Sequence, residues 1–269
     1  MVYNLVIDKL KKLTQHDYLE IVTRGNSAID SAVKLLSKEK KLLIPEEGGW
    51  LHYKTVPKMQ GVEEIEVKCN NAIIDVEDLK LKLTQHDCSA LLYQNPGGYF
   101  APQDMEKIYQ LCQENNCLVI LDVSGSIGTM LCNGNYADII IGSFGKWKLV
   151  EAQTGGFIST KSKELFEKLE LEKLDNDHIF LINQKIDELP NRIRFLEEIK
   201  DKIINDFTNH NLEILYPDEI MFVIIIKYRN NDEMERVINY CKDNNLPWTE
   251  CPRYIRLNDK AISIELKRL

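Results

Sequence analysis

The middle of the chain alternates short, fully apolar runs with longer stretches in which apolar residues recur at helical spacing. Runs rich in Val, Ile and Leu predict buried strands, and spacings of three and four residues predict amphipathic helices. Strands that are apolar at every position and separated by helices are typical of a parallel sheet covered on both faces. The predicted strands are Lys41–Pro45, Ser89–Tyr93, Cys117–Asp122 and Ala137–Gly142, and the predicted helices are 26–38, Val76–Leu83 and 103–115.

The pattern changes after about residue 160. Residues 161–211 carry Lys- and Glu-rich faces and predict continuous helix. A strand at Glu219–Tyr228, a helix at Asp232–Asn244 and a final strand at Ala261–Glu265 follow it. We therefore expect an α/β fold with two domains: a mainly parallel sheet flanked by helices in residues 1–160, and connecting helices with a small C-terminal α+β domain in residues 161–269.

Composition narrows the possible functions. The 269 residues hold 34 Lys and Arg against 42 Asp and Glu, a formal charge of −8, whereas nucleic-acid binding requires an excess of clustered cations. The longest apolar run, Ile220–Ile226, is too short to span a bilayer. The first residues lack the basic and apolar regions of a signal peptide. We expect a cytoplasmic protein that binds neither nucleic acid nor membrane.

The cysteines and histidines do not form a metal-binding pattern. The seven cysteines are spread along the chain without a CxxC pair, and the five histidines show no i, i+4 pairing. Structural zinc sites and disulfide frameworks use closer, paired spacings. We expect reduced thiols and no metal site.

Polar residues and glycines follow each predicted strand. In open parallel sheets, ligands bind outside the carboxyl ends of the strands, so these segments are the candidate site. Each is ambiguous alone, because a Gly-Asn-Ser turn can be a plain helix cap and an Asp at a strand end a turn residue. The segments are Thr23–Ala28, Gly48–His52, Gln94–Gly98, Asp122–Ser126 and Ser143–Lys148, and Gly155-Gly156 follows them.

Their order and spacing are more specific. From about residue 20 to 160 the chain resembles the fold-type-I pyridoxal-phosphate (PLP) enzymes, and among them the DegT/DnrJ/EryC1/StrS aminotransferase family. The segment Asp138–Lys148 carries most of the resemblance, because that family has a serine five residues before its Schiff-base lysine and Gly-Gly seven residues after it. Ser143, Lys148 and Gly155-Gly156 meet both spacings. Lys146 is the competitor, since related aminotransferases use Ser-x-x-Lys.

The resemblance implies PLP as cofactor and a role for each polar group. Lys148 would form the internal aldimine and act as general base, and Asp122 would face the pyridine nitrogen. Gly25, Asn26 and Ser27 would bind the phosphate at a helix N-terminus, with Ser143 adding its hydroxyl. Asn95 would lie near the phenolic oxygen of the cofactor, and Trp50 or His52 would stack on its ring.

Some positions depart from the family pattern. Three residues after the aspartate, where many members carry His or Gln, this chain has Gly125. Most members are also about a hundred residues longer, so the C-terminal domain is short here. Arg253 and Arg256 are its candidate cations, and the resemblance gives Arg256 the substrate carboxylate.

The resemblance implies an aminotransferase that moves an amino group between an amino acid and a keto compound, with a keto sugar as one option. It also implies a homodimer, because such enzymes complete their sites across a dimer interface. Two alternatives remain. One is a PLP-dependent lyase or sulfur- or selenium-transfer enzyme on the same fold, and the other is a non-catalytic relative. A dinucleotide-binding protein is disfavoured by the lack of a GxGxxG motif after an early strand.

Overall fold

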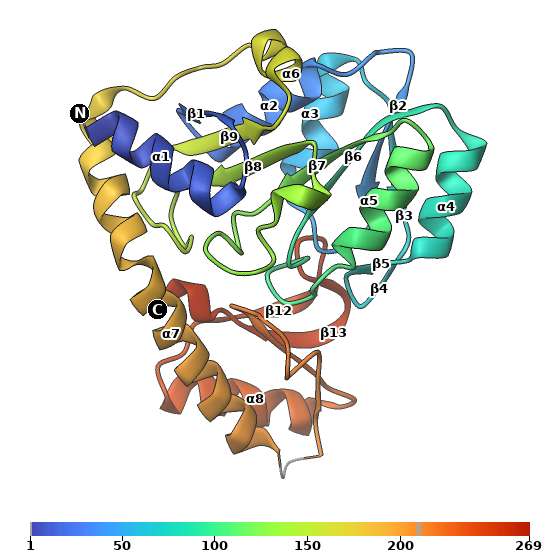
Figure 1. Cartoon of the computed structure of the whole chain (residues 1–269). Coiled ribbons are helices and arrows are strands. Elements are labelled where there is room, and N and C mark those ends of the chain that lie inside the picture. The colour runs from blue at the N-terminus through green and yellow to red at the C-terminus, as the bar shows by residue number, and fades with distance from the viewer. Residues whose placement is uncertain (1, 209–210) are drawn as a thin grey trace.

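A seven-stranded sheet forms the centre of the computed structural model, which describes residues 2–208 and 211–269 (Figure 1). The strand order is β1-β9-β8-β7-β6-β2-β3, and β9 runs antiparallel to both of its neighbours while the other pairs in the sheet are parallel. The strands are β1 Tyr18–Val22, β2 Lys41–Pro45, β3 Glu64–Val67, β6 Cys88–Gln94, β7 Leu118–Asp122, β8 Ile139–Ser143 and β9 Gly156–Thr160.

The two faces of this sheet pack against different cores, which explains the continuous apolar runs in its central strands β2, β6, β7 and β8. In β2, Leu42 and Ile44 belong to one buried cluster, while Leu43 belongs to the other. Successive side chains of a strand point to opposite faces. Burial on both faces therefore requires apolar residues at even and odd positions alike, as in the predicted parallel sheet.

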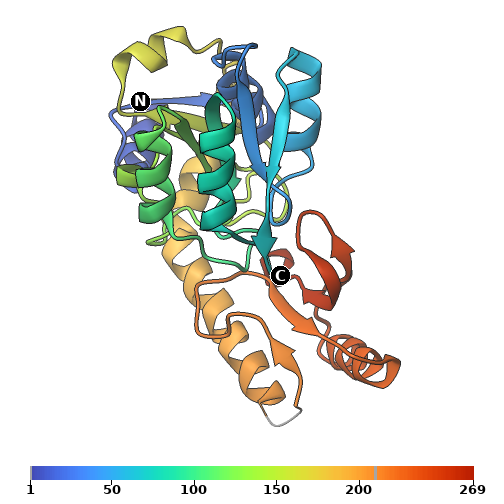
Figure 2. The same ribbon diagram turned by 90° about the vertical axis from the view of Figure 1, so that its right-hand side faces the viewer.

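Helices cover both faces (Figure 2). The first core packs under α2 Gly25–Lys34 and α3 His52–Gln60. The second packs under α1 Val2–Thr14, α4 Val76–Gln85 and α5 Met105–Glu114. The predicted class, a mainly parallel sheet flanked by helices, is therefore confirmed.

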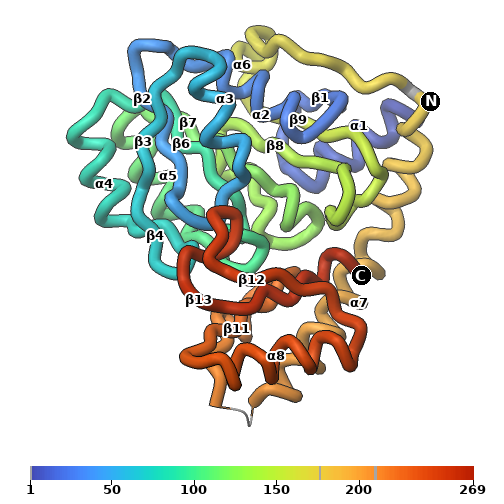
Figure 3. The backbone as a smooth tube through the Cα atoms, turned by 180° about the vertical axis from the view of Figure 1, so that it is seen from behind, coloured from blue at the N-terminus to red at the C-terminus, as the bar shows by residue number. Residues whose placement is uncertain are grey.

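The C-terminal part is built on a second, antiparallel sheet of order β10-β11-β13-β12. In Figures 1 and 3, its strands β12 and β13 lie between the large sheet and α8. The elements are α6 Lys163–Lys168, α7 Ile179–Phe207, β10 Glu213–Ile214, β11 Ile224–Lys227, α8 Asn231–Asp243, β12 Trp248–Arg253 and β13 Leu257–Ile264; a small hairpin, β4 Cys69–Asn70 with β5 Ile73–Ile74, lies earlier in the chain.

The predicted continuous helix over 161–211 is wrong. Between α6 and α7 the backbone runs past the edge strand β1. Thr23 N donates to Glu172 O at 3.0 Å, and Leu174 N donates to Ile21 O at 3.1 Å. An edge strand has unpaired backbone groups, and these bonds satisfy some of them at the cost of helical ones.

Three further observations concern thiols, membranes and metals. All seven cysteines are free, and six of them are buried. Within the described residues, no helix has the length and apolar character needed to cross a membrane, and no group of three or more His, Cys, Asp or Glu side chains gathers as a metal site.

Candidate functional site

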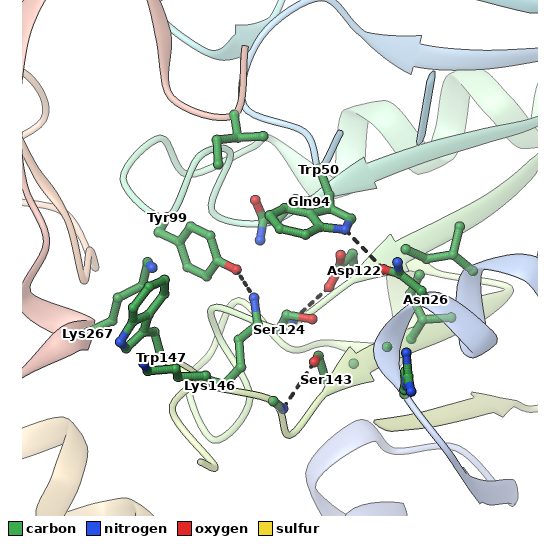
Figure 4. Close-up of a pocket in the computed structure, with 18 of the residues that line it drawn as sticks. Asn26, Trp50, Gln94, Tyr99, Asp122, Ser124, Ser143, Lys146, Trp147 and Lys267 are labelled. Atoms are coloured by element: carbon green, nitrogen blue, oxygen red, sulfur yellow. Dashed lines mark hydrogen bonds between the residues drawn. The ribbon is translucent and has the colours of Figure 1, made fainter. Parts of the chain in front are cut away.

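A cleft of about 650 Å³ opens where the large sheet meets the C-terminal part (Figure 4). The carboxyl ends of β6, β7 and β8 and the N-terminus of α2 line one side of it, and residues from 253 to 268 line the other. Among the residues predicted for the site, those that line the cleft are Gly25, Asn26, Trp50, Asp122, Ser143, Lys148 and Arg256.

We call the corner between the start of α2 and the end of β8 the anion-binding corner, because free amides at a helix N-terminus are able to bind an anion. Arg24 is the N-cap residue of α2, and its side chain makes no capping hydrogen bond. The first backbone amides of the helix are therefore available to a ligand. A Cβ on Gly25 would lie 2.6 Å from the Cβ of Ser143. Only glycine therefore lets the helix start approach this serine. Ser143 Oγ accepts a hydrogen bond from Gly145 N at 3.2 Å.

Ser27 lies at the edge of this corner. Its hydroxyl bonds to the hydroxyl of Thr23 at 2.8 Å and donates to Glu172 at 3.1 Å. The side chain does not line the cleft but a neighbouring hollow. Its predicted phosphate contact stays a prediction.

Asp122 ends β7 and is buried at the back of the cleft. Its Oδ2 accepts a hydrogen bond from the Tyr53 hydroxyl at 2.7 Å, and its Oδ1 accepts one from Ser124 N at 2.8 Å. Burial, and then the adjacent Asp122 charge, raise the pKa of Tyr53 well above its usual value. Tyr53 is thus a neutral donor that fixes the carboxylate.

The two candidate lysines differ in surroundings. Lys148 is half-buried, its amine donates a hydrogen bond to the Tyr99 hydroxyl, and its Nζ lies 5.4 Å from the ring centroid of Trp50. Lys146 is exposed, with its Nζ 4.7 Å from the ring centroid of Trp147. The geometry favours Lys148 as the reactive amine, although both side chains reach the cleft.

The two candidate aromatic residues separate in the same way. Trp50 lines the cleft, and its Nε1 donates to Asn26 Oδ1 at 3.0 Å (Figure 4). The imidazole of His52 is instead hydrogen-bonded through Nε2 to Asp30 Oδ1 at 2.7 Å and through Nδ1 to Thr55 Oγ1 at 2.9 Å. His52 does not line the cleft, so of the two aromatic candidates only Trp50 does.

Asn95 is fully buried next to the cleft rather than in its lining. Its Oδ1 accepts a hydrogen bond from Gln103 N at 3.0 Å, and its Nδ2 makes no hydrogen bond within the described residues. The preceding residue, Gln94, reaches the cleft instead. The predicted contact of Asn95 with the phenolic oxygen therefore stays a prediction.

Arg256 lies in the wall formed by the C-terminal part, and only 2 % of it is exposed. It donates to both carboxylate oxygens of Glu265, from Nε at 3.0 Å and from Nη2 at 2.8 Å. Lys267 Nζ lies 3.3 Å and Arg268 Nε 3.4 Å from the same carboxylate. Three basic side chains thus surround one carboxylate, and all three line the cleft.

The charges of this cluster shift two pKa values. Burial raises the pKa of Glu265, but the attraction of Arg256, its hydrogen bond and the two other cations outweigh burial and hold the pKa well below its usual value. Burial, followed by repulsion from Arg256, lowers the pKa of Lys267 to about 7. An anionic group bound here would favour the charged form of Lys267.

Several cleft residues have no signal in the sequence. Tyr99, Lys267 and Arg268 line the cleft, and Tyr53 contacts it through Asp122. Tyr53 and Tyr99 directly follow two of the candidate segments without being part of them, whereas tertiary packing alone brings Lys267 and Arg268 to the site. Gln94 could have been found, since it ends a predicted strand at the binding edge.

Comparison with known proteins places these features in a family context. The model of the DegT/DnrJ/EryC1/StrS aminotransferase family matches residues 61–177. A Streptococcus pneumoniae protein named as a sugar aminotransferase, in its PLP form, superposes with a TM-score of 0.80 over 99 % of this chain and 86 % of that one, at 11 % identity. The chain has the fold of this protein, and its residues 61–177 resemble the DegT/DnrJ/EryC1/StrS aminotransferase family.

Other fold-type-I proteins match as well. The alanine–glyoxylate aminotransferase of Nostoc sp. superposes with a TM-score of 0.77 over 98 % of this chain and 81 % of that one, at 12 % identity. A curated relative from Saccharolobus solfataricus, "Probable glycine dehydrogenase (decarboxylating) subunit 1", is 30 % identical over 128 residues. That match spans 43 % of this chain and 28 % of the relative.

Proposed function

We propose that this chain binds PLP in the cleft, attaches it to Lys148, and transfers an amino group between an amino acid and a keto compound. The observation that carries the proposal is the convergence of three groups on one cleft: the anion-binding corner at Gly25 and Ser143, the buried Asp122, and the half-buried Lys148 amine. They match the phosphate, the ring nitrogen and the aldehyde of PLP. The similarity to PLP-dependent proteins in sequence and fold supports this choice of cofactor.

Each residue of the cleft has its own role in this proposal. When bound, PLP supplies an aldehyde that a lysine amine can attack and a ring that withdraws electrons from the substrate Cα. The α2 amides and Ser143 would hold the phosphate, and Trp50 would lie against the ring. Asp122, held by Tyr53, would keep a proton on the ring nitrogen. Lys148 would serve as the general base for the substrate Cα proton.

The C-terminal wall supplies the substrate contacts in this proposal. Arg256 is already paired with Glu265, so a substrate carboxylate would be held by the excess charge that Arg256 shares with Lys267 and Arg268. A keto sugar is one acceptor that the family resemblance suggests. The same proposal includes that the chain forms a homodimer and that it is cytoplasmic.

Absorbance spectroscopy of the purified protein with added PLP tests the cofactor assignment. We expect a visible absorbance band, and borohydride reduction followed by peptide mass spectrometry should find the cofactor on Lys148. Lys148→Ala should lose the band, whereas the matched control Lys146→Ala should keep it. A band that survives Lys148→Ala and disappears in Lys146→Ala would reverse the lysine assignment, and no band at all would reject PLP binding.

A second candidate is a different PLP reaction, such as a lyase or a sulfur- or selenium-transfer reaction, and the match to a glycine dehydrogenase (decarboxylating) subunit favours this alternative. Assays of the loaded protein separate the two. Amino transfer to a keto acid supports the first, while CO₂ release or elimination without transfer supports the second. A loaded protein inactive in all of them would point to a non-catalytic relative.

A further inference from the structure

Tyr99, which no motif predicted, lies directly against the proposed reactive amine. Only 3 % of the residue is exposed, and its hydroxyl accepts a hydrogen bond from Lys148 Nζ (Figure 4). The same Nζ lies 5.0 Å from the ring centroid of Tyr99 and 5.4 Å from that of Trp50. The amine is therefore located between two aromatic side chains, with the hydroxyl of Tyr99 as its hydrogen-bond partner.

Two further cations pack on the ring of Tyr99. Lys267 Nζ lies 4.6 Å and Arg256 Cζ lies 5.1 Å from its centroid. Cations are attracted to the face of an aromatic ring, so these contacts hold the ring in place.

The backbone of Tyr99 is held in an unusual conformation. Its φ is +72°, a left-handed value that is disfavoured for a bulky residue. Hydrogen bonds fix it on both sides, because Tyr99 N donates to Pro96 O at 3.0 Å and Tyr99 O accepts from Phe222 N at 3.0 Å. Such conformations persist where the surroundings impose them, often at functional sites.

Gly125 provides the space for the ring. A Cβ at this position would lie 2.5 Å from Cδ1 and 2.9 Å from Cε1 of Tyr99, far inside van der Waals contact. The ring therefore occupies the volume that a side chain at residue 125 would take. Any larger residue here must displace Tyr99 or the turn that follows Asp122.

We propose that Tyr99 is a positioning residue whose hydroxyl holds the Lys148 amine in the cleft, and that Gly125 serves to admit its ring. The role of the amine rests on the proposed function, in which Lys148 attaches the cofactor. The hydrogen bond restricts rotation of a flexible side chain and keeps its amine facing the space beside Trp50 and Asp122. A group held in a reactive orientation reacts faster than one that rotates freely.

The decisive variant is Tyr99→Phe, which keeps the ring and removes only the hydroxyl. Tyr93→Phe is the matched control, because Tyr93 is buried and its hydroxyl makes no hydrogen bond in the described part of the chain. With added PLP, we expect attachment to Lys148 about tenfold slower in Tyr99→Phe. The circular dichroism of the bound cofactor should also be weaker. Tyr93→Phe should match the unmodified protein in both measurements.

A second measurement works without any cofactor. Trace reductive methylation with formaldehyde reports how available each amine is, because formaldehyde is small enough to reach any rotamer. Release from Tyr99 should raise the labelling of Lys148 relative to Lys146 about fivefold in Tyr99→Phe. PLP attachment and formaldehyde labelling thus change in opposite directions. Because local unfolding would also expose the amine, the denaturation midpoint of Tyr99→Phe and its labelling of Lys146 must stay at the values of the unmodified protein.

Gly125→Ala tests whether the space at Gly125 is needed for the ring of Tyr99. It leaves the hydroxyl in place but forces the ring away, so it should reproduce both effects of Tyr99→Phe. Because both substitutions break one hydrogen bond, the double variant should be little worse than either single variant.

The outcomes separate this inference from the proposed function. PLP attachment at the unmodified rate in Tyr99→Phe, with unchanged dichroism, would overturn the positioning role while leaving PLP binding intact. Where the unmodified protein attaches no PLP, the formaldehyde ratio decides. An unchanged ratio rejects the contact between Tyr99 and Lys148, and a raised ratio supports it although the proposed function has failed.

Discussion

At the scale of single residues, the site depends on buried polar groups that hold one another in place. Asp122 is fixed by Tyr53, and Glu265 is surrounded by Arg256, Lys267 and Arg268. Buried charges are tolerated only when they are paired. Because each group is ordered by its neighbours rather than by a ligand, these side chains are arranged for binding in advance.

Tyr53→Phe should destabilise the protein by about 1–3 kcal/mol. The substitution leaves one oxygen of the buried Asp122 without its donor, and an unsatisfied buried group costs that much. Chemical denaturation followed by far-UV circular dichroism measures the change. Tyr93→Phe, which loses no hydrogen bond, provides the baseline, and equal stabilities for the two variants would argue against the contact.

Lys267 should make stability depend on pH. Its pKa falls from 10.5 to about 7 on folding, chiefly through burial, so between these values the unfolded chain binds more protons than the folded one. The free energy of unfolding should therefore rise from about pH 7 toward pH 10, by at most about 1.4 kcal/mol per pH unit. Below about pH 7 this contribution should be flat.

Denaturant titrations across that pH range test the assignment. Lys267→Met should flatten the rise, whereas substitution of the exposed Lys260 by Met should preserve it. A rise that persists in Lys267→Met would assign it to another group.

At the scale of secondary-structure elements, one helix and one strand must approach closely to make the anion-binding corner. α2 begins at Gly25, directly beside Ser143 of β8. Gly156 of β9 leaves room for this helix start, since a Cβ on Gly156 would lie 2.7 Å from Gly25 N. The glycines at positions 25 and 156 permit this packing. The proposed phosphate contact of Ser143 therefore depends on the close packing of α2, β8 and β9.

Gly25→Ala should weaken PLP binding by about tenfold. The added methyl group would lie 2.6 Å from the Cβ of Ser143, so the start of α2 must move away from the serine and the phosphate loses hydrogen bonds. Absorbance titration with PLP measures the affinity. Lys34→Ala, at the far end of the same helix, should bind as the unmodified protein does, and equal affinity in Gly25→Ala would exclude the corner as the phosphate site.

At the scale of the whole molecule, the charge of the cleft is opposite to that of the protein. The formal charge of the chain is −8, yet the only acidic side chain among the described residues lining the cleft is Asp122. The cations that line it are Arg24, Lys146, Lys148, Arg253, Arg256, Lys267 and Arg268. A concave site of one sign concentrates ligands of the opposite sign.

The association rate of PLP should therefore fall as salt increases, by about three- to tenfold between low ionic strength and roughly 0.5 M. Stopped-flow absorbance measures this rate. Pyridoxal, which lacks the phosphate, is the matched ligand and should show a much smaller dependence. Equal salt dependence for both ligands would contradict attraction of the phosphate by the cleft.

The sequence by itself determined the apolar core strands and their order along the chain. A strand that is buried on both faces is a continuous apolar run, and such a run is visible in the sequence without knowledge of the neighbouring strands. β2 was predicted at its observed bounds, Lys41–Pro45. The sequence did not reveal β1, β3 or β9, which carry Glu, Gly, Ser or Thr where the predicted strands are apolar. It also did not reveal the break in the helix predicted over 161–211. It also singled out the strand-end segments that contain Asp122, Ser143 and Lys148, because consecutive parallel strands end at the same edge. The resemblance to the DegT/DnrJ/EryC1/StrS family then gave these three residues their expected roles.

Only the tertiary structure decided the rest of the site. It placed Trp50 rather than His52 in the cleft, set Asn95 beside it, and brought Tyr99 to the Lys148 amine. Tyr99 and Lys267 are separated by most of the chain, so no local pattern relates them. Their contact arises when the C-terminal part packs on the sheet, and this packing is a sum of many non-local interactions that spacing along a sequence does not record.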